Sequence, residues 1–519
     1  MTRRSEEIGR GLAAARPARP IEAGEPIHVL GAAGAGASAA ALLAQRAGAH
    51  VSGCDPGGPS PYTTALEAAG ISLEWRHSPT HLEPMEGRPP RRLAVTKALT
   101  AVDPDQPELA AARRLGIPAE PWQQVVADAA ATSGKRLLAV AGTHGKSTTT
   151  GWLIHLLVEA GRDPSAFVGA LLDARLSGGL PATARWGGGD TFVVEADEYA
   201  GNFDPYRPDV ALLLNAEWDH PDVFADEAAV VEAFSGWLSA AAGAGRRPQL
   251  VANVGSPGVS RILGQLSGWP GSVLTVALDG AAGPAAAAAA ADLTARVEPR
   301  PESGSRLTVS RRGGSQQSYE VGLAGLHNAE NALVVVGAAQ LLGVEEEALR
   351  ASLAGFGGVG RRLERKGEAG GVLVLDDYGH HPTAIERTIE AVRLSHPGRR
   401  LWAVYEPLTY HRTAHMLERF ADVLAGADQV AIADIWAGRD PDTTVTSSAA
   451  LAAAIAGRGQ APAQATGSVE ETADHLAQRV RPGDVVLVMG GGRAYVIAER
   501  LLELLGRAPA EEGGAVPGR

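Results

Sequence analysis

The sequence predicts an α/β protein of three domains: an N-terminal Rossmann-like domain, a central P-loop domain with a parallel-rich sheet, and a C-terminal doubly wound Rossmann-like domain. The 519 residues are enough for about three domains. Short apolar runs alternate with helical patterns along most of the chain. Glycine-rich turns directly follow two of these runs. We expect domains at 25–134, 135–358 and 359–519, preceded by a disordered tail, 1–24.

The N-terminal domain opens with a strand at 27–30, a glycine turn at 31–36, an alanine-rich helix to residue 45 and a second strand at 50–53. Asp55 follows that strand, close to the distance at which dinucleotide-binding folds place an acid beside a ribose. Ala33 occupies the second glycine position of that fingerprint, so the turn is weak support for NAD. We expect a diphosphate at the turn and Asp55 near a ribose or base. The alternative is a tight turn needed only for helix–sheet packing.

The central domain begins with an apolar run at 137–141, a glycine loop and a helix over 148–159. Loop N–H groups and a helix N-terminus favour a bound anion. Lys146 would reach the β- and γ-phosphates, and the Ser147 hydroxyl would ligate Mg²⁺. Val140 stands where a standard Walker A has glycine, so an ordinary βα turn is the alternative.

Two more predicted strands of this domain, 191–194 and 210–214, lead into Glu195 and His220. Because ligands collect at the carboxyl ends of parallel strands, we expect both side chains to face the phosphate loop and to hold Mg²⁺. A solvated strand end is the alternative. Further on, His327 and Asn331 share one helical face and are suited to a base edge, unless this segment only caps the helix through Asn328. The Ala- and Gly-rich stretch 281–291 is predicted to be a surface insertion.

The C-terminal domain shows strands at 371–375, 401–405, 430–433 and 484–489, again with polar residues at their ends. The glycine-rich stretch 355–360 before it predicts a hinge that allows closure over the middle domain. Arg412 lies in the loop after the second of these strands. Its planar guanidinium is suited to bind the carboxylate of an amino acid through two parallel hydrogen bonds. The alternative is a surface ion pair with a neighbouring acid.

Composition narrows the function. A net charge of −12 argues against a general nucleic-acid partner. No apolar run approaches the ~20 residues of a membrane span. Cys54 is the only cysteine, which excludes an intrachain disulfide and fits a reducing cytoplasm, and we expect it to be a small core residue. The sequence leaves a monomer and a homodimer open.

Taken together, these stretches resemble the Mur ligase family of peptidoglycan synthesis over about residues 27–505. The motifs that carry the resemblance are GAAGAGAS at 31–38, AGTHGKSTTT at 141–150, EADE at 195–198, NAEWDH at 215–220, GLHNAEN at 325–331, GRR at 360–362, DDYGHHPT at 376–383 and YHRT at 410–413. The pair GTHGK and DDYGHHP is highly specific.

The resemblance implies a role for each motif. ATP phosphates would be bound by Gly142, Thr143, His144, Gly145, Lys146, Ser147 and Thr148. Adenine would contact His327 and Asn331, and Arg361, Arg362, Asp376 and Asp377 would close over the nucleotide. Magnesium ligands would be Ser147, Glu195 and His220. The UDP-sugar would lie on Gly31, Gly34, Gly36, Ser38 and Asp55, and the amino acid would be placed by His380, Tyr410 and Arg412. The residues expected to carry catalysis are Lys146, Glu195, His220, Arg361 and Arg412.

The implied activity is ATP- and Mg²⁺-dependent ligation of L-alanine to the lactyl carboxylate of UDP-N-acetylmuramate through an acyl phosphate. The stretches EADEYAGNFDP and DHPDVF also resemble the branch of the family that joins a recycled tripeptide to the same nucleotide sugar. Two hypotheses come from other classes: an NAD-dependent oxidoreductase, which rests on the first domain alone, and a nucleotide-binding protein without catalysis.

Overall fold

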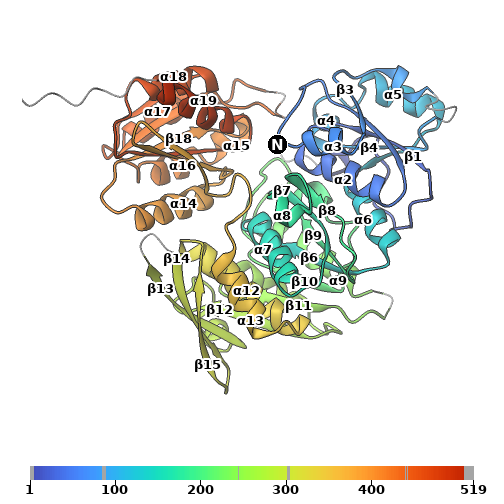
Figure 1. The fold of residues 1–519 in the computed structure, drawn as a ribbon, viewed down its shortest axis with the longest axis horizontal. Helices are drawn as coiled ribbons and strands as arrows, with labels where there is room; N and C mark the ends of the chain where they lie inside the picture. Colours follow the sequence, from blue (N-terminus) through green and yellow to red (C-terminus); the bar gives the residue numbers. More distant parts are fainter. Residues whose placement is uncertain are drawn as a thin grey trace, which may run out of the picture. The chain divides into compact units, whose positions relative to one another are not determined.

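A computed structural model describes residues 5–83, 89–243, 245–300, 304–438, 440 and 442–507. The chain divides into two compact units, 1–360 and 361–519, and each is described by itself. The first unit contains two β-sheets and the second contains one, so the α/β class and the three sheet-centred domains expected from the sequence are confirmed (Figure 1). Among the described helices, none combines the length and the apolar character needed to cross a membrane.

The first sheet of unit 1 is parallel throughout and has the strand order β3-β2-β1-β4-β5, which is the Rossmann order without a sixth strand. Its strands are β1 (Pro26–Leu30), β2 (His50–Cys54), β3 (Ser72–Glu74), β4 (Arg92–Val95) and β5 (Ala119–Pro121). Its helices are α1 (Ser5–Ile8), α2 (Ala35–Arg46), α3 (Thr64–Ala68), η1 (Pro79–Leu82), α4 (Lys97–Val102), α5 (Pro107–Leu115) and α6 (Trp122–Ser133). Alternation along β1 directs Ile27 and Val29 into the core under α2 and α6, and Leu30 into a second core under α5.

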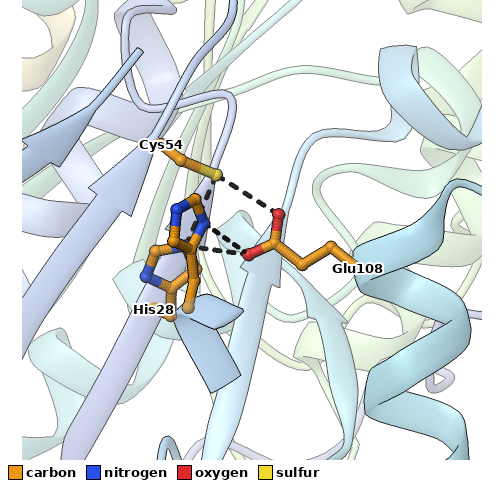
Figure 2. A group of neighbouring side chains, drawn as sticks. His28, Cys54 and Glu108 are labelled. Atoms are coloured by element: carbon orange, nitrogen blue, oxygen red, sulfur yellow. Dashed lines mark hydrogen bonds and ion pairs between the residues drawn. The ribbon is translucent and has the colours of Figure 1, made fainter. Parts of the chain in front are cut away.

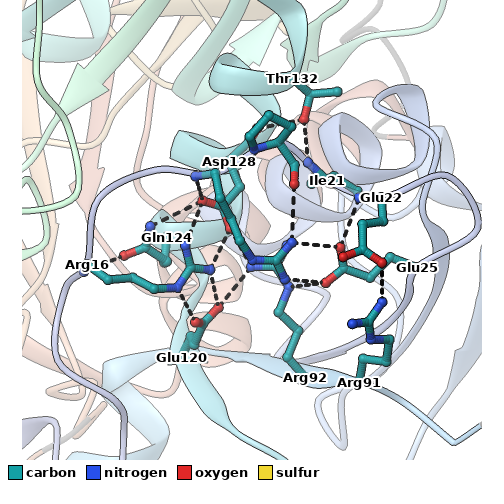
Figure 3. A network of polar contacts seen from close by, with 12 residues as sticks. Arg16, Ile21, Glu22, Glu25, Arg91, Arg92, Glu120, Gln124, Asp128 and Thr132 are labelled. Atoms are coloured by element: carbon teal, nitrogen blue, oxygen red, sulfur yellow. Dashed lines mark hydrogen bonds and ion pairs between the residues drawn. The ribbon is translucent and has the colours of Figure 1, made fainter.

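The expectation that 1–24 is a disordered tail was wrong for its described part. Arg16 donates hydrogen bonds to Glu120 at 2.8 Å and to Asp128 at 2.7 Å, across more than a hundred residues of sequence (Figure 3). The same two carboxylates pair with Arg92, a buried arginine of β4 that also lies 3.1 Å from Glu25. A buried cation needs paired carboxylates, and these ion pairs fix the N-terminal segment to the domain. Residues 1–4 lie outside the described residues.

The second sheet of unit 1 has the order β15-β14-β13-β12-β11-β10-β6-β9-β7-β8. Its strands are β6 (Arg136–Ala141), β7 (Ser165–Leu172), β8 (Ala182–Arg185), β9 (Thr191–Ala196), β10 (Val210–Leu213), β11 (Gln249–Asn253), β12 (Val273–Leu278), β13 (Leu293–Arg300), β14 (Gly304–Arg311) and β15 (Gln316–Val321). Its helices are α7 (Lys146–Glu159), α8 (Ala174–Ser177), η2 (Tyr199–Gly201), α9 (Glu227–Ala241), α10 (Pro257–Gln265), α11 (Ala285–Ala289), α12 (Leu326–Leu342) and α13 (Glu346–Gly355). Strands β8, β14 and β15 are antiparallel to their neighbours and extend a parallel centre.

Two expectations about this domain concern its connecting segments. The stretch 281–291 lies in the crossover between the parallel strands β12 and β13 and contains α11, which has no buried residue. That this surface stretch is an insertion stays a prediction. In the stretch 355–360, Phe356 and Val359 are buried against Gly151, and the Gly360 N–H donates to Leu171 O at 2.8 Å. The division between the units falls immediately after this stretch, and its action as a hinge stays a prediction.

Unit 2 contains a six-stranded sheet of order β16-β17-β21-β18-β19-β20, parallel except for the edge strand β16. Its strands are β16 (Glu364–Ala369), β17 (Val372–Asp377), β18 (Leu401–Glu406), β19 (Gln429–Ala433), β20 (Ala463–Gly467) and β21 (Val485–Gly490). Its helices are α14 (Pro382–Ser395), α15 (Tyr410–His415), α16 (Leu417–Leu424), α17 (Ser448–Ala456), α18 (Val469–Ala477) and α19 (Ala494–Arg507). The buried strands β17 and β18 end in the acidic residues Asp376, Asp377 and Glu406.

Candidate active site

The phosphate loop of unit 1 connects the buried strand β6 to α7 and requires glycine at two positions. Gly142 has φ +147°, and a Cβ there would lie 2.9 Å from the Leu214 side chain. Gly145 has φ +80° at the N-cap of α7, and a Cβ there would lie 2.6 Å from Asn331 Oδ1. The loop therefore has the backbone shape that lets a helix N-terminus approach a phosphate without a side chain between them.

The NAEWDH stretch after β10 holds this loop in shape. The His144 N–H donates to Asn215 Oδ1 at 2.8 Å, and the Asn215 amide donates back to His144 O at 3.1 Å. The Thr143 hydroxyl donates to Glu217 O at 3.1 Å and accepts the Glu217 N–H at 2.9 Å. Asn215 therefore supports the loop, a role that the motif in the sequence did not predict.

Lys146 lies among carbonyls and carboxylates. Its Nζ donates to Gly142 O at 2.6 Å and to Glu198 Oε2 at 2.8 Å. Burial lowers the pKa of Lys146, but the Glu198 and Asp197 carboxylates outweigh it and raise that pKa to about 12. Burial raises the pKa of Glu198 to about 7, against the opposing effect of Lys146. Lys146 is thus a permanent cation beside a carboxyl group that titrates near neutrality.

Two of the predicted magnesium ligands come together at the start of α7. The Ser147 hydroxyl donates to Glu195 Oε1 at 3.0 Å, and Glu195 Oε2 accepts the Gly169 N–H at 2.7 Å. Both side chains are buried, and Thr148 follows them in the first turn of α7. A hydroxyl and a carboxylate beside a phosphate loop are a donor set suited to Mg²⁺.

The third predicted ligand, His220, belongs to a different group of side chains. Its ring, with Asp197 and Glu198, offers potential ligand atoms within 4.8 Å of one another. His220 has φ +53°, and its ring lies 4.8 Å from that of Tyr199. Burial raises the pKa of Asp197, but Lys146 and His220 outweigh it, and that pKa is lowered. From the EADE stretch, only Glu195 was predicted as a metal ligand. A second cation site would use Asp197 and Glu198 as well.

The helix α12 brings Asn331 against the phosphate loop. Asn331 is buried beside Gly145, and its amide donates to Asn328 Oδ1 at 3.4 Å. His327 is half-buried in the first turn of the helix. Asn328 does not cap the helix through its side chain and instead donates to Ala324 O at 2.7 Å. The adenine contacts of His327 and Asn331 stay a prediction.

The glycine turn after β1 includes residues that could contact a ligand and residues that pack against the domain. Asp55 accepts the Ala33 N–H at 3.1 Å, so it fixes the turn, and Gly34 is the N-cap of α2. Gly31 has φ +82°. A Cβ on Gly36 would lie 2.1 Å from Trp122, and the fully buried Ser38 hydroxyl pairs with Thr183 at 3.0 Å. Gly36 and Ser38 therefore have packing contacts of their own, and the UDP-sugar contacts of all five residues stay a prediction.

In unit 2, the predicted nucleotide residues form a connected group at the end of β17. Arg361 has φ +58°, and its guanidinium donates to Asp376 at 3.3 Å and to Gly490 O at 2.8 Å. Burial raises the pKa of Asp376 to about 6, and burial likewise raises the pKa of Asp377. Asp377 accepts the N–H groups of Leu363 and Gly379. These contacts fix the chain around Arg361.

Of the predicted amino-acid ligands, Arg412 is the most enclosed. It lies in α15 and is 2% exposed, which excludes the surface ion pair considered as the alternative. Tyr410 begins the same helix and is half-buried. His380 Nδ1 lies 2.9 Å from Tyr378 O, and Arg362 lies 5.0 Å from the Tyr378 ring.

Fold and site together define a three-domain α/β protein whose central domain carries a phosphate-binding loop with acidic strand ends. Three family models match the chain in turn: "Mur ligase family, catalytic domain" at 26–133, "Mur ligase middle domain" at 140–339 and "Mur ligase, glutamate ligase domain" at 361–492. The chain belongs to the Mur ligase family.

Named relatives cover nearly the whole chain. The UDP-N-acetylmuramate–L-alanine ligase of Gloeobacter violaceus is 33% identical over 490 residues, 93% of this chain and 97% of that protein. Its counterpart from Kineococcus radiotolerans is 36% identical over 480 residues, 92% and 96% of the two chains. Among solved structures, a UDP-N-acetylmuramate-alanine ligase from Thermotoga maritima matches with TM-score 0.74 at 22% identity, over 92% of this chain and 98% of that one. A murein peptide ligase from Psychrobacter arcticus matches with TM-score 0.69 at 27% identity, over 94% and 100%.

Proposed function

We propose that this chain is an ATP-dependent ligase that joins L-alanine to the lactyl carboxylate of UDP-N-acetylmuramate, an amide-forming step in peptidoglycan precursor synthesis. The observation that carries the proposal is the phosphate loop, with Lys146 and the Ser147–Glu195 pair, in a chain 33–36% identical to relatives named for this reaction. The NAD-dependent oxidoreductase hypothesis leaves this loop unexplained.

A carboxylate is a poor acyl donor, so the reaction needs an activation step. A carboxylate oxygen attacks the γ-phosphorus of ATP, ADP leaves, and an acyl phosphate forms. Lys146, which contacts Glu198 and loop carbonyls in this structure, turns to the β- and γ-phosphate oxygens and neutralises their charge. Ser147 and Glu195, with Asp197, Glu198 and His220, would hold Mg²⁺, which supplies charge neutralisation at the phosphates.

Amide formation follows when the neutral amine of L-alanine attacks the acyl carbon. The C–O bond to phosphate breaks, inorganic phosphate leaves with the former carboxylate oxygen, and the amine loses a proton. Arg412 holds the carboxylate of the incoming amino acid through its two parallel N–H donors. No protein nucleophile is required, so positioning and charge stabilisation account for the rate.

The glycine turn of the N-terminal domain is the proposed site of the UDP diphosphate. Gly31 and Gly34 leave room for the backbone to approach it, and Asp55 holds the turn through the Ala33 N–H. Since both nucleotides are soluble metabolites, we place the reaction in the cytoplasm, carried out by a monomer or a homodimer.

A second candidate is ligation of the recycled tripeptide to the same nucleotide sugar. The observation in its favour is the match to the murein peptide ligase, with TM-score 0.69 at 27% identity. The two reactions share the acyl phosphate and differ only in the amine, so they are separated by amino-donor preference.

An oxygen-isotope experiment tests the acyl phosphate. UDP-N-acetylmuramate labelled with ¹⁸O in the lactyl carboxylate should transfer one label to inorganic phosphate for each amide formed, and only with ATP and L-alanine present. Unlabelled phosphate alongside product would contradict the route. ATP binding without phosphate release would instead support the hypothesis of a nucleotide-binding protein without catalysis.

A further inference from the structure

We propose that the N-terminal domain holds a structural zinc-type metal ion on His28, Cys54, His81 and Glu108. These residues come from four separate elements: β1, the end of β2, η1 and the first turn of α5. Each offers a ligand atom, and all four atoms lie within 4.8 Å of one another. The function proposed above uses none of them. Figure 2 shows His28, Cys54 and Glu108 directed toward a common point.

Four distances within the cluster, 3.1–3.5 Å, are close to those between the ligand atoms of a tetrahedral ion. With metal–nitrogen bonds of ~2.0–2.1 Å and a metal–sulfur bond of ~2.3 Å, neighbouring ligand atoms lie about 3.3–3.6 Å apart. Here His28 Nε2 lies 3.4 Å from Cys54 Sγ and 3.2 Å from Glu108 Oε1. His81 Nδ1 lies 3.1 Å from Glu108 Oε1, and Cys54 Sγ lies 3.5 Å from Glu108 Oε2.

Three of the four proposed ligands are buried, and neighbouring residues outside the cluster orient them through hydrogen bonds. Cys54 and Glu108 are 0% exposed and His28 is 2% exposed. His28 Nδ1 pairs with the Ser52 hydroxyl at 2.7 Å, which leaves Nε2 to face the cluster, as second partners of metal-binding histidines do. The Ser78 N–H donates to Glu108 Oε2 at 3.3 Å. His77, 3.2 Å from Cys54 Sγ, adds a polar neighbour.

Charge balance also favours a cation in the cluster. A thiolate and a carboxylate with two neutral imidazoles carry two negative charges, which one divalent ion cancels inside an apolar core.

Ligand chemistry separates this site from the magnesium positions. A thiolate with two imidazoles selects zinc and related ions, whereas hydroxyl and carboxylate oxygens select Mg²⁺. The ion would tie β1, β2, η1 and α5 together immediately before Asp55, the residue that holds the glycine turn. Metal binding would therefore stabilise the N-terminal domain around its nucleotide turn.

Cobalt substitution tests the proposal on the full chain in magnesium buffer. Because Cys54 is the only cysteine, a sulfur-to-Co²⁺ charge-transfer band can arise only here. We expect the wild-type protein to bind one equivalent of Co²⁺ with this band and with intense tetrahedral d–d bands. Zn²⁺ should displace the cobalt and raise the thermal midpoint.

Variants and a matched control complete the test. Cys54→Ser should abolish the band, and Glu108→Gln should weaken Co²⁺ binding by about tenfold or more. His50→Ala, which removes an exposed histidine of β2, should behave as wild type. A folded wild-type protein that shows no charge-transfer band on cobalt addition would overturn the proposal, as would a Zn²⁺ stabilisation that persists unchanged in a folded Cys54→Ser variant.

Discussion

Replacing Lys146 by methionine should separate the catalytic role of this residue from its structural role. The raised pKa of Lys146, about 12 against an ordinary 10.5, is what remains after the cost of burial is set against the attraction of the carboxylates, and it favours the charged form by about 2 kcal/mol. Lys146→Met should lower the local stability of α7 by about that amount, since Glu198 loses its cation. Loss of the charge at the γ-phosphate should lower kcat by about 10²–10³-fold or more.

The double variant Lys146→Met/Glu198→Gln distinguishes the two effects. Removing the buried carboxyl charge should restore the protection of α7 amides in hydrogen exchange, while phosphate release stays at or below the level of the single variant, because Glu198 is also a proposed Mg²⁺ ligand. Lys135→Met, which changes a lysine that contacts Ser165 and Trp186 away from the loop, should keep the wild-type rate. A single variant with wild-type phosphate release, or a double variant that regains the rate, would refute the role given to Lys146.

Three further predictions follow from the site and the N-terminal segment. Glu195→Gln or His220→Ala should each raise the Mg²⁺ concentration for half-maximal rate; unchanged magnesium dependence in both would place the metal elsewhere. Arg412→Lys keeps the charge but loses the planar pair of N–H donors. At ~1.5–3 kcal/mol per charge-assisted hydrogen bond, the KM for L-alanine should rise about tenfold, with little change in the KM for UDP-N-acetylmuramate. An equal rise for both substrates would remove Arg412 from the amino-acid site. Burial raises the pKa of the Asp128 and Glu25 carboxyls, but the surrounding arginines outweigh it and lower both pKa values. The ion pairs therefore stabilise the fold above about pH 4, and this stabilisation is lost as the pH falls through the lowered pKa values. Hydrogen exchange of β4 and α6 should show opening in that acidic range, and protection that persists well below it would contradict the pairing.

Local features of the sequence were enough to predict the phosphate loop. The strand, the glycines and the helix are neighbours in the chain, so a short stretch of sequence predicts the strand–loop–helix geometry. Lys146 and Ser147 belong to that stretch, whereas Glu195 was predicted from its place at the end of a second strand. Asp197 and Glu198 did not stand out, because the chain turns after β9 through residues such as Ala200, with φ +48°, which no periodicity predicts.

The features that the sequence did not predict depend on distant partners. Arg16 is fixed by carboxylates 104 and 112 positions away, so the segment around it has only the composition of a tail. The His28–Cys54–His81–Glu108 cluster likewise lacks the short ligand spacing of zinc-binding motifs. The close approach of Trp122 to Gly36 showed that one glycine of a nucleotide-type turn also has a packing role.

The most direct test of the proposed function is the amino-donor preference of the purified enzyme. Phosphate release with ATP, Mg²⁺ and UDP-N-acetylmuramate should be measured against L-alanine, glycine, L-serine and the free tripeptide, and compared as kcat/KM. The proposed function predicts the highest value for L-alanine. A higher value for the tripeptide would contradict it and assign the chain to the recycling reaction.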